Sequence, residues 1–519
     1  MTELEAVIEI GSTGLRLLVA QIREHGVHEK ADRNGAGWTV IDRSEMPVAL
    51  GRDVFTDGFI SRETLLQCLQ ILNRFQEQLA GWGIQNEHVA VIATSAFREA
   101  RNRDAVLDRI MVKTGFHVKV IDGIEENRLM YLAVSECLKD KTFHLEGMNS
   151  IILEVGGGST ELMLIEQGKM AGAHSLRLGT VIIEQQLRAM MGSLQDARRF
   201  LEEFIRNTRG SLDTELNLSN VLQFIAVGSE AQIAAGICGT KISDNLWQIS
   251  RTAFDGFVDD IQEYSIEECV ARFKIPYSDA QALHIGLMAY KFFLKLTNAQ
   301  EILVPHTSIR EGLIASRLLQ PDVKLQDDFR LQVTASALSL ARKYKADEKH
   351  AEYVSMISLK LFDALKAELG LEERSRMLLE VAAILHDIGM FIRADKHEEH
   401  SMYIIAHADI FGLTQDDIAI ISQVAYYHRG SHSPQDDAQF AVRPRADRIT
   451  ILKLTAILRV ADAFDRGHSQ KINDFSIDFR QDSLIIKCKG THNIMLERMA
   501  VAEKSNVFES VFGYKVILV

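Results

Sequence analysis

Two distant stretches of the chain share one pattern, VIEIGSTGLRLLVA from Val7 and IILEVGGGSTELMLI from Ile151. Each is an apolar run that ends in a carboxylate, Glu9 or Glu154, followed by a turn of small residues and a second apolar run. Such a pattern is typical of a β-hairpin. Its repetition predicts a duplicated α/β fold.

The two turns have a composition suited to phosphate. Glycine lets backbone N–H groups approach an anion closely, Ser and Thr hydroxyls add donors, and the carboxylate before each turn can hold a hydrated divalent cation. A single copy would be read more simply as a tight hairpin with a charge at its edge. Two copies with the same carboxylate-x-Gly order favour a site.

The length of 519 residues is too great for one hydrophobic core and predicts several domains. After each hairpin, strand-like runs alternate with helix-like runs, which indicates α/β layers. The segment AFREARNRDAVLDRIMVKTG in particular is expected to form one helix. Beyond about residue 326 the pattern is helical and rich in histidine, and the last fifty residues alternate like strands. The predicted domains are α/β domains at 1–138 and 139–322, an all-helical domain at 323–470 and a small α+β domain at 471–519.

Composition excludes several classes of protein. The formal net charge of −13 argues against broad nucleic-acid binding, so any polyanion must find a local basic groove. The five cysteines form no CxxC pair, and we find neither a signal peptide nor ~20 uninterrupted apolar residues. We therefore expect a cytoplasmic protein without a membrane or specific nucleic-acid partner.

A candidate acid–base residue lies in the segment DGIEENRLMYLAV, where Glu125 and Glu126 open a predicted helix after a strand. Acids at a helix N-terminus can simply complement the macrodipole. Arg98 and Arg101 in ATSAFREARN point to more, because arginine at a strand-to-helix turn is suited to bidentate phosphate contact. A solvated helix face remains the alternative, above all for Arg101.

These segments, together with LEVGGGSTEL, LRLGTV, AVGSEA and SIREGL, resemble the exopolyphosphatase / guanosine pentaphosphatase family. The resemblance implies two actin-like (ribonuclease H-like) α/β domains and Mg²⁺- or Mn²⁺-dependent hydrolysis. Glu126 would orient the attacking water, Glu161 would support the site, and Glu9 and Glu154 would hold the metal. The phosphate-binding residues would be Ser12, Thr13, Arg98, Gly156, Gly157, Gly158 and Ser159.

The sequence also departs from the pattern of this family. Glu9 and Glu154 occupy positions where the family usually has aspartate, Ala49 replaces a common arginine, and Asn127 replaces an alanine. A carboxylate one methylene farther out either shifts the metal or weakens the activity, since a ~1 Å misplacement can cost on the order of 10²-fold in rate.

The helical domain contains a second set of candidate ligands. His386 and Asp387 are adjacent in AAILHDIGMFI, and a buried ionisable pair is costly unless it is coordinated or hydrogen-bonded. With His350 and Asp462 they resemble the metal site of HD-type phosphohydrolases, which would take a second divalent cation. His400 and His428 are further candidates, with structural histidines as the alternative. A basic set could line a polyanion groove or form a solvated face: Arg443, Arg445, Arg448, Lys453 and Arg459.

Four functions compete. The first is an exopolyphosphatase that releases terminal orthophosphate from inorganic polyphosphate. The second is hydrolysis of the 5′ γ-phosphate of guanosine pentaphosphate, and the third is a regulatory protein that binds polyphosphate or an alarmone with little or no turnover. The fourth places phosphodiesterase chemistry at the HD-type site. The resemblance further implies a homodimer.

Overall fold

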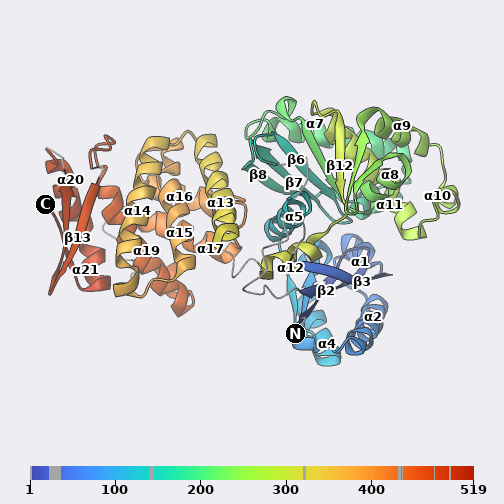
Figure 1. Cartoon of the computed structure of the whole chain (residues 1–519), viewed down its shortest axis with the longest axis horizontal. Helices are drawn as coiled ribbons and strands as arrows, with labels where there is room; N and C mark the ends of the chain where they lie inside the picture. Colours follow the sequence, from blue (N-terminus) through green and yellow to red (C-terminus); the bar gives the residue numbers. More distant parts are fainter. Residues whose placement is uncertain are drawn as a thin grey trace, which may run out of the picture. The chain divides into compact units, whose positions relative to one another are not determined.

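The computed structural model describes residues 3–22, 37–139, 145–318, 323–429, 434, 437–472, 474–489 and 493–519. It divides into two compact units, Met1–Asp328 and Phe329–Val519 (Figure 1). The predicted boundary at residue 322 lies outside the described residues. None of the described helices is long and apolar enough to cross a membrane.

The first sheet of the N-terminal unit begins with the predicted hairpin. β1 pairs antiparallel with β2, β2 pairs antiparallel with β3, and β4 and β5 continue parallel to β1. In sheet order the strands are β3 (Trp38–Pro47), β2 (Gly14–Ile22), β1 (Glu3–Ile10), β4 (Val89–Ala93) and β5 (Val118–Val120). The helices that follow these strands are α1 (Leu50–Asp57), α2 (Arg62–Gly81), α3 (Ser95–Glu99), α4 (Arg103–Thr114) and α5 (Gly123–Leu138).

The single helix expected after β4 is wrong, because the structure has two helices there, α3 and α4. The chain between them is held in a different conformation by its neighbours. The Asn102 amide exchanges hydrogen bonds with the backbone of Ile60, at 3.0 and 2.9 Å. The backbone N–H of Arg101 donates to the Gly58 carbonyl at 2.9 Å. Arg101 and Asn102 therefore find hydrogen-bond partners outside a helix, and the chain does not continue from α3 into α4 as one helix.

The second sheet repeats the order of the first. β6, β7 and β8 form an antiparallel meander, β9 and β12 continue parallel to β6, and two antiparallel strands extend the edge. In sheet order the strands are β10 (Thr240–Ser243), β11 (Leu246–Ser250), β12 (Glu301–Pro305), β9 (Gln223–Val227), β6 (Ser150–Val155), β7 (Thr160–Glu166) and β8 (Lys169–Leu176). The predicted duplication is therefore visible in the strand order.

The helices of the second half surround this sheet and share a core with it. They are α6 (Thr180–Ala189), α7 (Leu194–Leu212), α8 (Ser229–Cys238), α9 (Arg251–Ile261), α10 (Ile266–Phe273) and α11 (Tyr277–Lys295). The next helix, α12 (Ile309–Leu318), packs instead against α5 and the first sheet, where Ile314 meets Val7 and Leu18. A Cβ at Gly312 would lie 1.9 Å from the Leu129 carbonyl oxygen, so only glycine permits this close approach of α12 to α5.

The C-terminal unit combines helices with a small sheet around one core. Its helices are α13 (Val323–Lys343), α14 (Glu348–Leu369), α15 (Glu373–Leu385), α16 (His397–Ala406), α17 (Gln415–Tyr427), α18 (Ala438–Ala441) and α19 (Arg445–Ala463), with a 3₁₀ turn at η3 (Ile388–Phe391). The final segment contains β13 (Asp474–Arg480), β14 (Ser483–Lys489), α20 (Met495–Lys504), α21 (Asn506–Phe512) and β15 (Lys515–Leu518). Phe475 and Phe508 of this segment belong to the same core as the helices, which ties the tail to them.

Candidate functional site

The two glycine turns of the N-terminal unit have equivalent backbone geometry. In the first, the N–H of Gly11 donates to the Gly14 carbonyl at 2.9 Å; in the second, the N–H of Gly156 donates to the Ser159 carbonyl at the same distance. Each turn closes a hairpin whose incoming strand carries the glutamate, Glu9 or Glu154, two residues before the first glycine. The structure brings both turns to one cavity of about 170 Å³.

That cavity is lined by carboxylates and by small polar groups. At ~30 Å³ per water molecule it has room for a phosphoryl group with a few waters. Among the residues predicted for the site, the cavity is lined by Glu9, Ser12, Thr13, Glu126, Glu154, Gly156, Gly157, Ser159 and Glu161. Residues far apart in the sequence therefore meet at one place.

Because Gly158 has no side chain, Phe55 and Ser95 of the first half of the unit can lie close to its backbone. A Cβ there would lie 2.4 Å from Cζ of Phe55 and 2.5 Å from Oγ of Ser95. Ser95 in turn hydrogen-bonds Ser12 of the first turn, with 3.0 Å between the two hydroxyl oxygens. The glycine triplet thus lets the second hairpin approach the first closely.

Glu126 lies in the first turn of α5, and Asp122 is the N-cap residue of this helix. The Asp122 carboxylate accepts the N–H of Glu125 at 2.8 Å, which fixes the start of the helix. Glu126 is buried and forms an ion pair with Arg98, whose guanidinium also donates to the Ile121 carbonyl at 2.9 Å. Burial raises the pKa of Glu126, while the charge of Arg98 acts in the opposite direction.

Glu154 differs from the other carboxylates of the cavity. Among the described residues, no ion pair or hydrogen bond of its carboxylate is found, and the charge of Arg16 acts on it without direct contact. Enclosure in the cleft, with Glu9 and Glu126 nearby, raises its pKa to about 8. A carboxylate in this situation fits a divalent cation, because the cation would supply the charge that the protein does not.

Glu9 already has two cationic neighbours. Its Oε1 lies 3.3 Å from Nη1 of Arg16, the residue opposite it in the hairpin, and its Oε2 lies 3.3 Å from Nε of Arg310. Arg310 comes from the start of α12. The sequence interpretation did not assign Arg310 a role, although it lies in the segment SIREGL that carries the family resemblance.

Glu161 is held by two donors from different elements. The Ser175 hydroxyl donates to its Oε1 at 2.7 Å, and the Asn127 amide donates to its Oε2 at 3.0 Å. Burial and the charge of Glu126 raise the pKa of Glu161 well above its ordinary value. The same Asn127 amide also lies 3.2 Å from the His174 carbonyl. Asn127, one of the departures from the family pattern, thereby links α5 to the second sheet next to Glu126.

A pocket of about 280 Å³ adjoins the cavity and shares Ser12, Thr13 and Thr180 with it. Its wall includes Ala49, and the cation Arg52 lies three residues farther along the same chain segment. The remaining wall is mostly neutral. The pocket could therefore take the part of a substrate that extends beyond its terminal phosphate.

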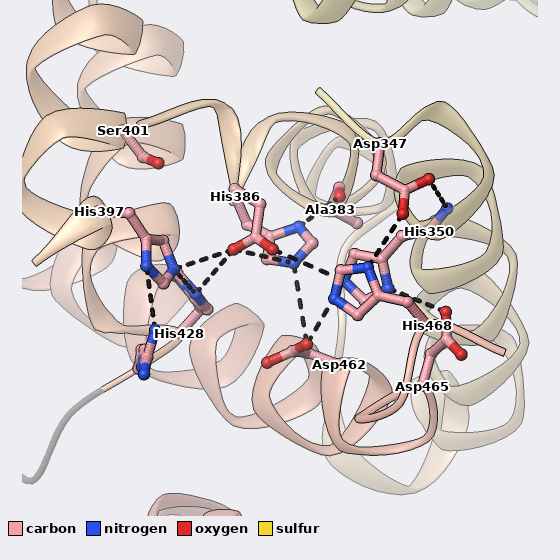
Figure 2. A network of polar contacts seen from close by, with 12 residues as sticks. Asp347, His350, Ala383, His386, His397, Ser401, His428, Asp462, Asp465 and His468 are labelled. Carbon is pink, nitrogen blue, oxygen red and sulfur yellow. Dashed lines mark hydrogen bonds and ion pairs between the residues drawn. The ribbon is translucent and has the colours of Figure 1, made fainter. Parts of the chain in front are cut away.

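The C-terminal unit contains the second predicted cluster (Figure 2). Nε2 of His350 and Nε2 of His386 lie 3.7 and 3.8 Å from Oδ1 of Asp462, and Asp387 contacts both histidines. His397 and His428 also point toward Asp387. From this helix the contact with Asp387 comes from His397, three residues before the candidate His400.

Two contacts in this unit could not be expected from the sequence. Lys504 of α20, in the C-terminal tail, forms an ion pair with Asp462. Arg459, for which the sequence left open a polyanion groove or a solvated face, is buried instead, and its guanidinium donates to the carbonyls of Tyr427 and Lys504, both at 3.1 Å. Its role in the structure is to join α17, α19 and α20.

The fold and the cavity define a class of protein. Two related α/β halves with matching hairpins around a phosphate-sized cavity make up an actin-like fold. The chain belongs to the Ppx/GppA phosphatase family: the model of that family matches residues 27–321. The model described as Ppx/GppA phosphatase, domain III, matches residues 333–503.

Several known proteins are similar to the chain over most of its length. The guanosine-5′-triphosphate,3′-diphosphate pyrophosphatase of Vibrio vulnificus is 24% identical over 468 residues, covering 88% of this chain and 86% of that protein. The protein of the same name from Photobacterium profundum is 22% identical over 501 residues, covering 94% and 92%. A solved exopolyphosphatase from Cytophaga hutchinsonii superposes with a TM-score of 0.53 at 21% identity, covering 61% of this chain and 98% of that one.

Proposed function

We propose that the chain hydrolyses the terminal phosphoanhydride bond of inorganic polyphosphate in the cavity between the two glycine turns. The observation that carries this proposal is the convergence of both turns and of Glu126 on one cavity. The turns offer backbone N–H groups and hydroxyls to the terminal phosphoryl group, and Glu126 faces the same space as a base.

Glu126 is suited to orient and deprotonate the attacking water. Burial raises the pKa of Glu126, which makes the carboxylate a stronger base than an exposed glutamate. Arg98 keeps the carboxylate in place, and the cations that line the cavity itself are Arg16 and Arg310. Water adds to the terminal phosphorus as the bridging P–O bond breaks, so orthophosphate leaves and the chain shortens by one unit.

Glu154 is the residue best placed to hold Mg²⁺ or Mn²⁺, and Glu9 would share it only by loosening its contacts with Arg16 and Arg310. When bound, the cation would neutralise charge on the phosphate oxygens. Gly156, Gly157, Gly158 and Ser159 would contact the phosphate from one side, and Ser12 and Thr13 from the other. Glu161 acts on this arrangement through Asn127, which fixes the start of α5 beside Glu126.

Guanosine pentaphosphate is the second candidate substrate, and two observations favour it. The curated relatives that match 88% and 94% of the chain carry the name of a guanosine-5′-triphosphate,3′-diphosphate pyrophosphatase. The adjoining pocket is largely neutral, with Arg52 as a cation and Glu184 as an acid. Such a wall accommodates a nucleoside more readily than a fully ionised phosphate chain.

A regulatory protein without turnover is the alternative that Glu9, Glu154 and Ala49, in place of the usual family residues, support. From the family resemblance and the composition we also infer a homodimer and a cytoplasmic location. Light scattering of the purified chain would test the dimer directly.

Phosphate release from both substrates tests the proposed function. We would compare the unmodified chain with Glu126→Gln and with Glu125→Gln, a matched control whose carboxylate pairs with Arg128. Glu126→Gln is expected to lose about 10²–10⁴-fold in rate, while Glu125→Gln keeps most of it. Full activity in Glu126→Gln would refute the proposal. Binding without any phosphate release by the unmodified chain would support the regulatory alternative.

A further inference from the structure

The start of α8 lies at the cavity between the two glycine turns. α8 follows β9, whose last residue, Val227, is the register partner of Glu154 in β6. Gly228, Ser229 and Glu230 line the cavity. The first N–H groups of a helix have no carbonyl partner within it and attract anions, and Gly228, the N-cap residue, has no side chain with which to cap them. By itself, this helix start would attract phosphate into one end of the cavity.

The carboxylate of Glu230 occupies this position instead. The Ser229 hydroxyl donates to Oε2 of Glu230 at 3.1 Å. A Cβ at Gly228 would lie 3.7 Å from the same oxygen, which places the carboxylate beside the residue that precedes the helix. Burial raises the pKa of Glu230, whereas its own backbone N–H and the Ser229 hydroxyl stabilise the charged form. Glu230 therefore takes the place at the helix start that a bound anion would take.

The packing of α8 against α11 leaves room for this conformation. A Cβ at Gly286 of α11 would lie 2.8 Å from Cγ of Glu230, so a larger residue at that position would displace the side chain. Glu230 is 7% exposed. The fold thus holds a carboxylate, almost fully buried, at the start of α8.

The first half of the unit has a small residue at the equivalent position. The strand residues paired in register with the two site glutamates are Ile92 in the first half and Val227 in the second. Three residues after them come Ser95 and Glu230. The Ser95 hydroxyl contacts that of Ser12 in the first glycine turn, at 3.0 Å. The second half therefore carries a carboxylate where the first carries a hydroxyl.

The negative charge of Glu230 is not neutralised by a direct contact. Among the described residues its carboxylate has no ion pair, and the charge of Arg16 acts on it from a distance. Glu9, in contrast, pairs directly with Arg16 and Arg310. A phosphate oxygen at the start of α8 would therefore meet an uncompensated carboxylate, which repels it.

We propose that Glu230 is a specificity-determining residue that excludes phosphate from the start of α8. A substrate phosphate that cannot enter this end of the cavity is directed to the adjoining pocket, which shares Ser12, Thr13 and Thr180 with the cavity. Orthophosphate released in the cavity is likewise not retained at the helix start, which favours its departure. The direction of the substrate rests on the proposed function, whereas the exclusion of phosphate is independent of hydrolysis.

Binding of inorganic orthophosphate to the full chain tests the proposal without turnover. Titration calorimetry in the presence of Mg²⁺ would compare the unmodified chain with Glu230→Ser, which introduces the residue type of the first half. The Kd of orthophosphate is expected to fall by about 10-fold or more, because the helix start can then bind the anion itself. Glu267→Ser is the matched control and is expected to leave the Kd unchanged, since Glu267 is an exposed acid in the first turn of α10, outside the cavity lining.

A second variant and a structure make the test independent of one substitution. Glu230→Gln keeps the shape of the side chain without its charge and is also expected to lower the Kd. Crystals of a Glu230 variant grown with orthophosphate should show the anion at the first N–H groups of α8. An unchanged Kd in a folded Glu230 variant would overturn the proposal, and so would orthophosphate bound at the start of α8 in the unmodified chain.

The proposed hydrolysis and this inference fail in different ways. An unmodified chain that releases no phosphate from either substrate, together with a lower Kd in Glu230→Ser, would refute the hydrolysis and support the exclusion of phosphate. Normal phosphate release together with an unchanged Kd in Glu230→Ser would support the hydrolysis and overturn the role of Glu230.

Discussion

Glu154 and Glu161 face each other across the β6–β7 pair, where the equivalent pair of the first hairpin is Glu9 and Arg16. The two hairpins share a fold but differ in charge at this position, since the first pairs an acid with a base and the second pairs two acids. In the first hairpin an arginine neutralises the glutamate at 3.3 Å. In the second, two carboxylates share one side of the sheet, and both have raised pKa values because of burial and neighbouring negative charge.

The first prediction concerns Glu154. Glu154→Gln is expected to raise the Mg²⁺ concentration for half-maximal phosphate release by about 10-fold or more, because a neutral amide binds a hard cation poorly. Titration of activity with Mg²⁺ measures this. Glu166→Gln is the control, since Glu166 is exposed at the other end of β7 and is not part of the cavity lining. An unchanged Mg²⁺ requirement in Glu154→Gln would remove Glu154 from the metal site.

The pH dependence of kcat/KM is expected to report Glu126. A base must be deprotonated, and burial raises the pKa of Glu126 above its ordinary value of 4.5, so kcat/KM falls as pH decreases through that raised pKa. The charge of Arg98 lowers this pKa. Arg98→Met is therefore expected to move the acid limb to higher pH.

Arg101→Met is the matched control for this pH profile. The guanidinium of Arg101 lies over the ring of Phe59, whereas the arginine paired with Glu126 is Arg98. Its acid limb is expected to coincide with that of the unmodified chain. An acid limb that does not move in Arg98→Met would mean that another group controls the rate.

Gly158→Ala is expected to impair the cavity more than Gly156→Ala does. The new methyl group at 158 would lie 2.4 Å from Phe55 and 2.5 Å from Ser95, whereas at 156 the nearest atom is the Ser159 carbonyl oxygen at 3.1 Å. We expect a loss of about 10²-fold in kcat/KM for Gly158→Ala, since the two hairpins would be displaced. Steady-state kinetics measure kcat/KM of both variants. An equal loss of kcat/KM in Gly158→Ala and Gly156→Ala would contradict the close approach at Gly158.

Lys504→Met is expected to destabilise the C-terminal unit in chelator by roughly 3 kcal/mol. The Lys504–Asp462 pair is largely buried, and removing one partner leaves a buried charge without compensation. Urea unfolding measures the change. Lys487→Met, which breaks an exposed pair with Asp478 in the same tail, should cost much less, because solvent screens that pair. Similar costs for the two variants would show that the Lys504 pair contributes little.

Local sequence patterns were sufficient to predict much of the fold. The alternation around Glu9 and Glu154 predicted both hairpins, and the apolar spacing after Gly123 predicted α5. The same reasoning missed the break between α3 and α4, because that break depends on hydrogen bonds to Ile60 and Gly58, which lie about forty residues earlier in the chain.

In both functional sites, too, contacts between residues that are distant in the sequence could not be predicted. The residue types in the glycine turns predicted several of the groups that line the cavity, although Arg98 and Gly158 are not part of its lining. The pairing of Glu9 with Arg310 depends on how α12 packs against the first sheet. His397 and His400 are both plausible from the sequence HEEH, and only the direction of α16 selects His397. Lys504 reaches Asp462 through the packing of the tail, which leaves no local signal.

Locating a bound substrate shows directly which of the two units carries out the hydrolysis. A crystal structure of the full Glu126→Gln chain with inorganic polyphosphate should show the terminal phosphate between Ser12 and Gly157, with Arg98 in contact. Anion density that appears only against His386 and Asp387, with the cavity between the glycine turns empty, would contradict the account and place the chemistry in the C-terminal unit.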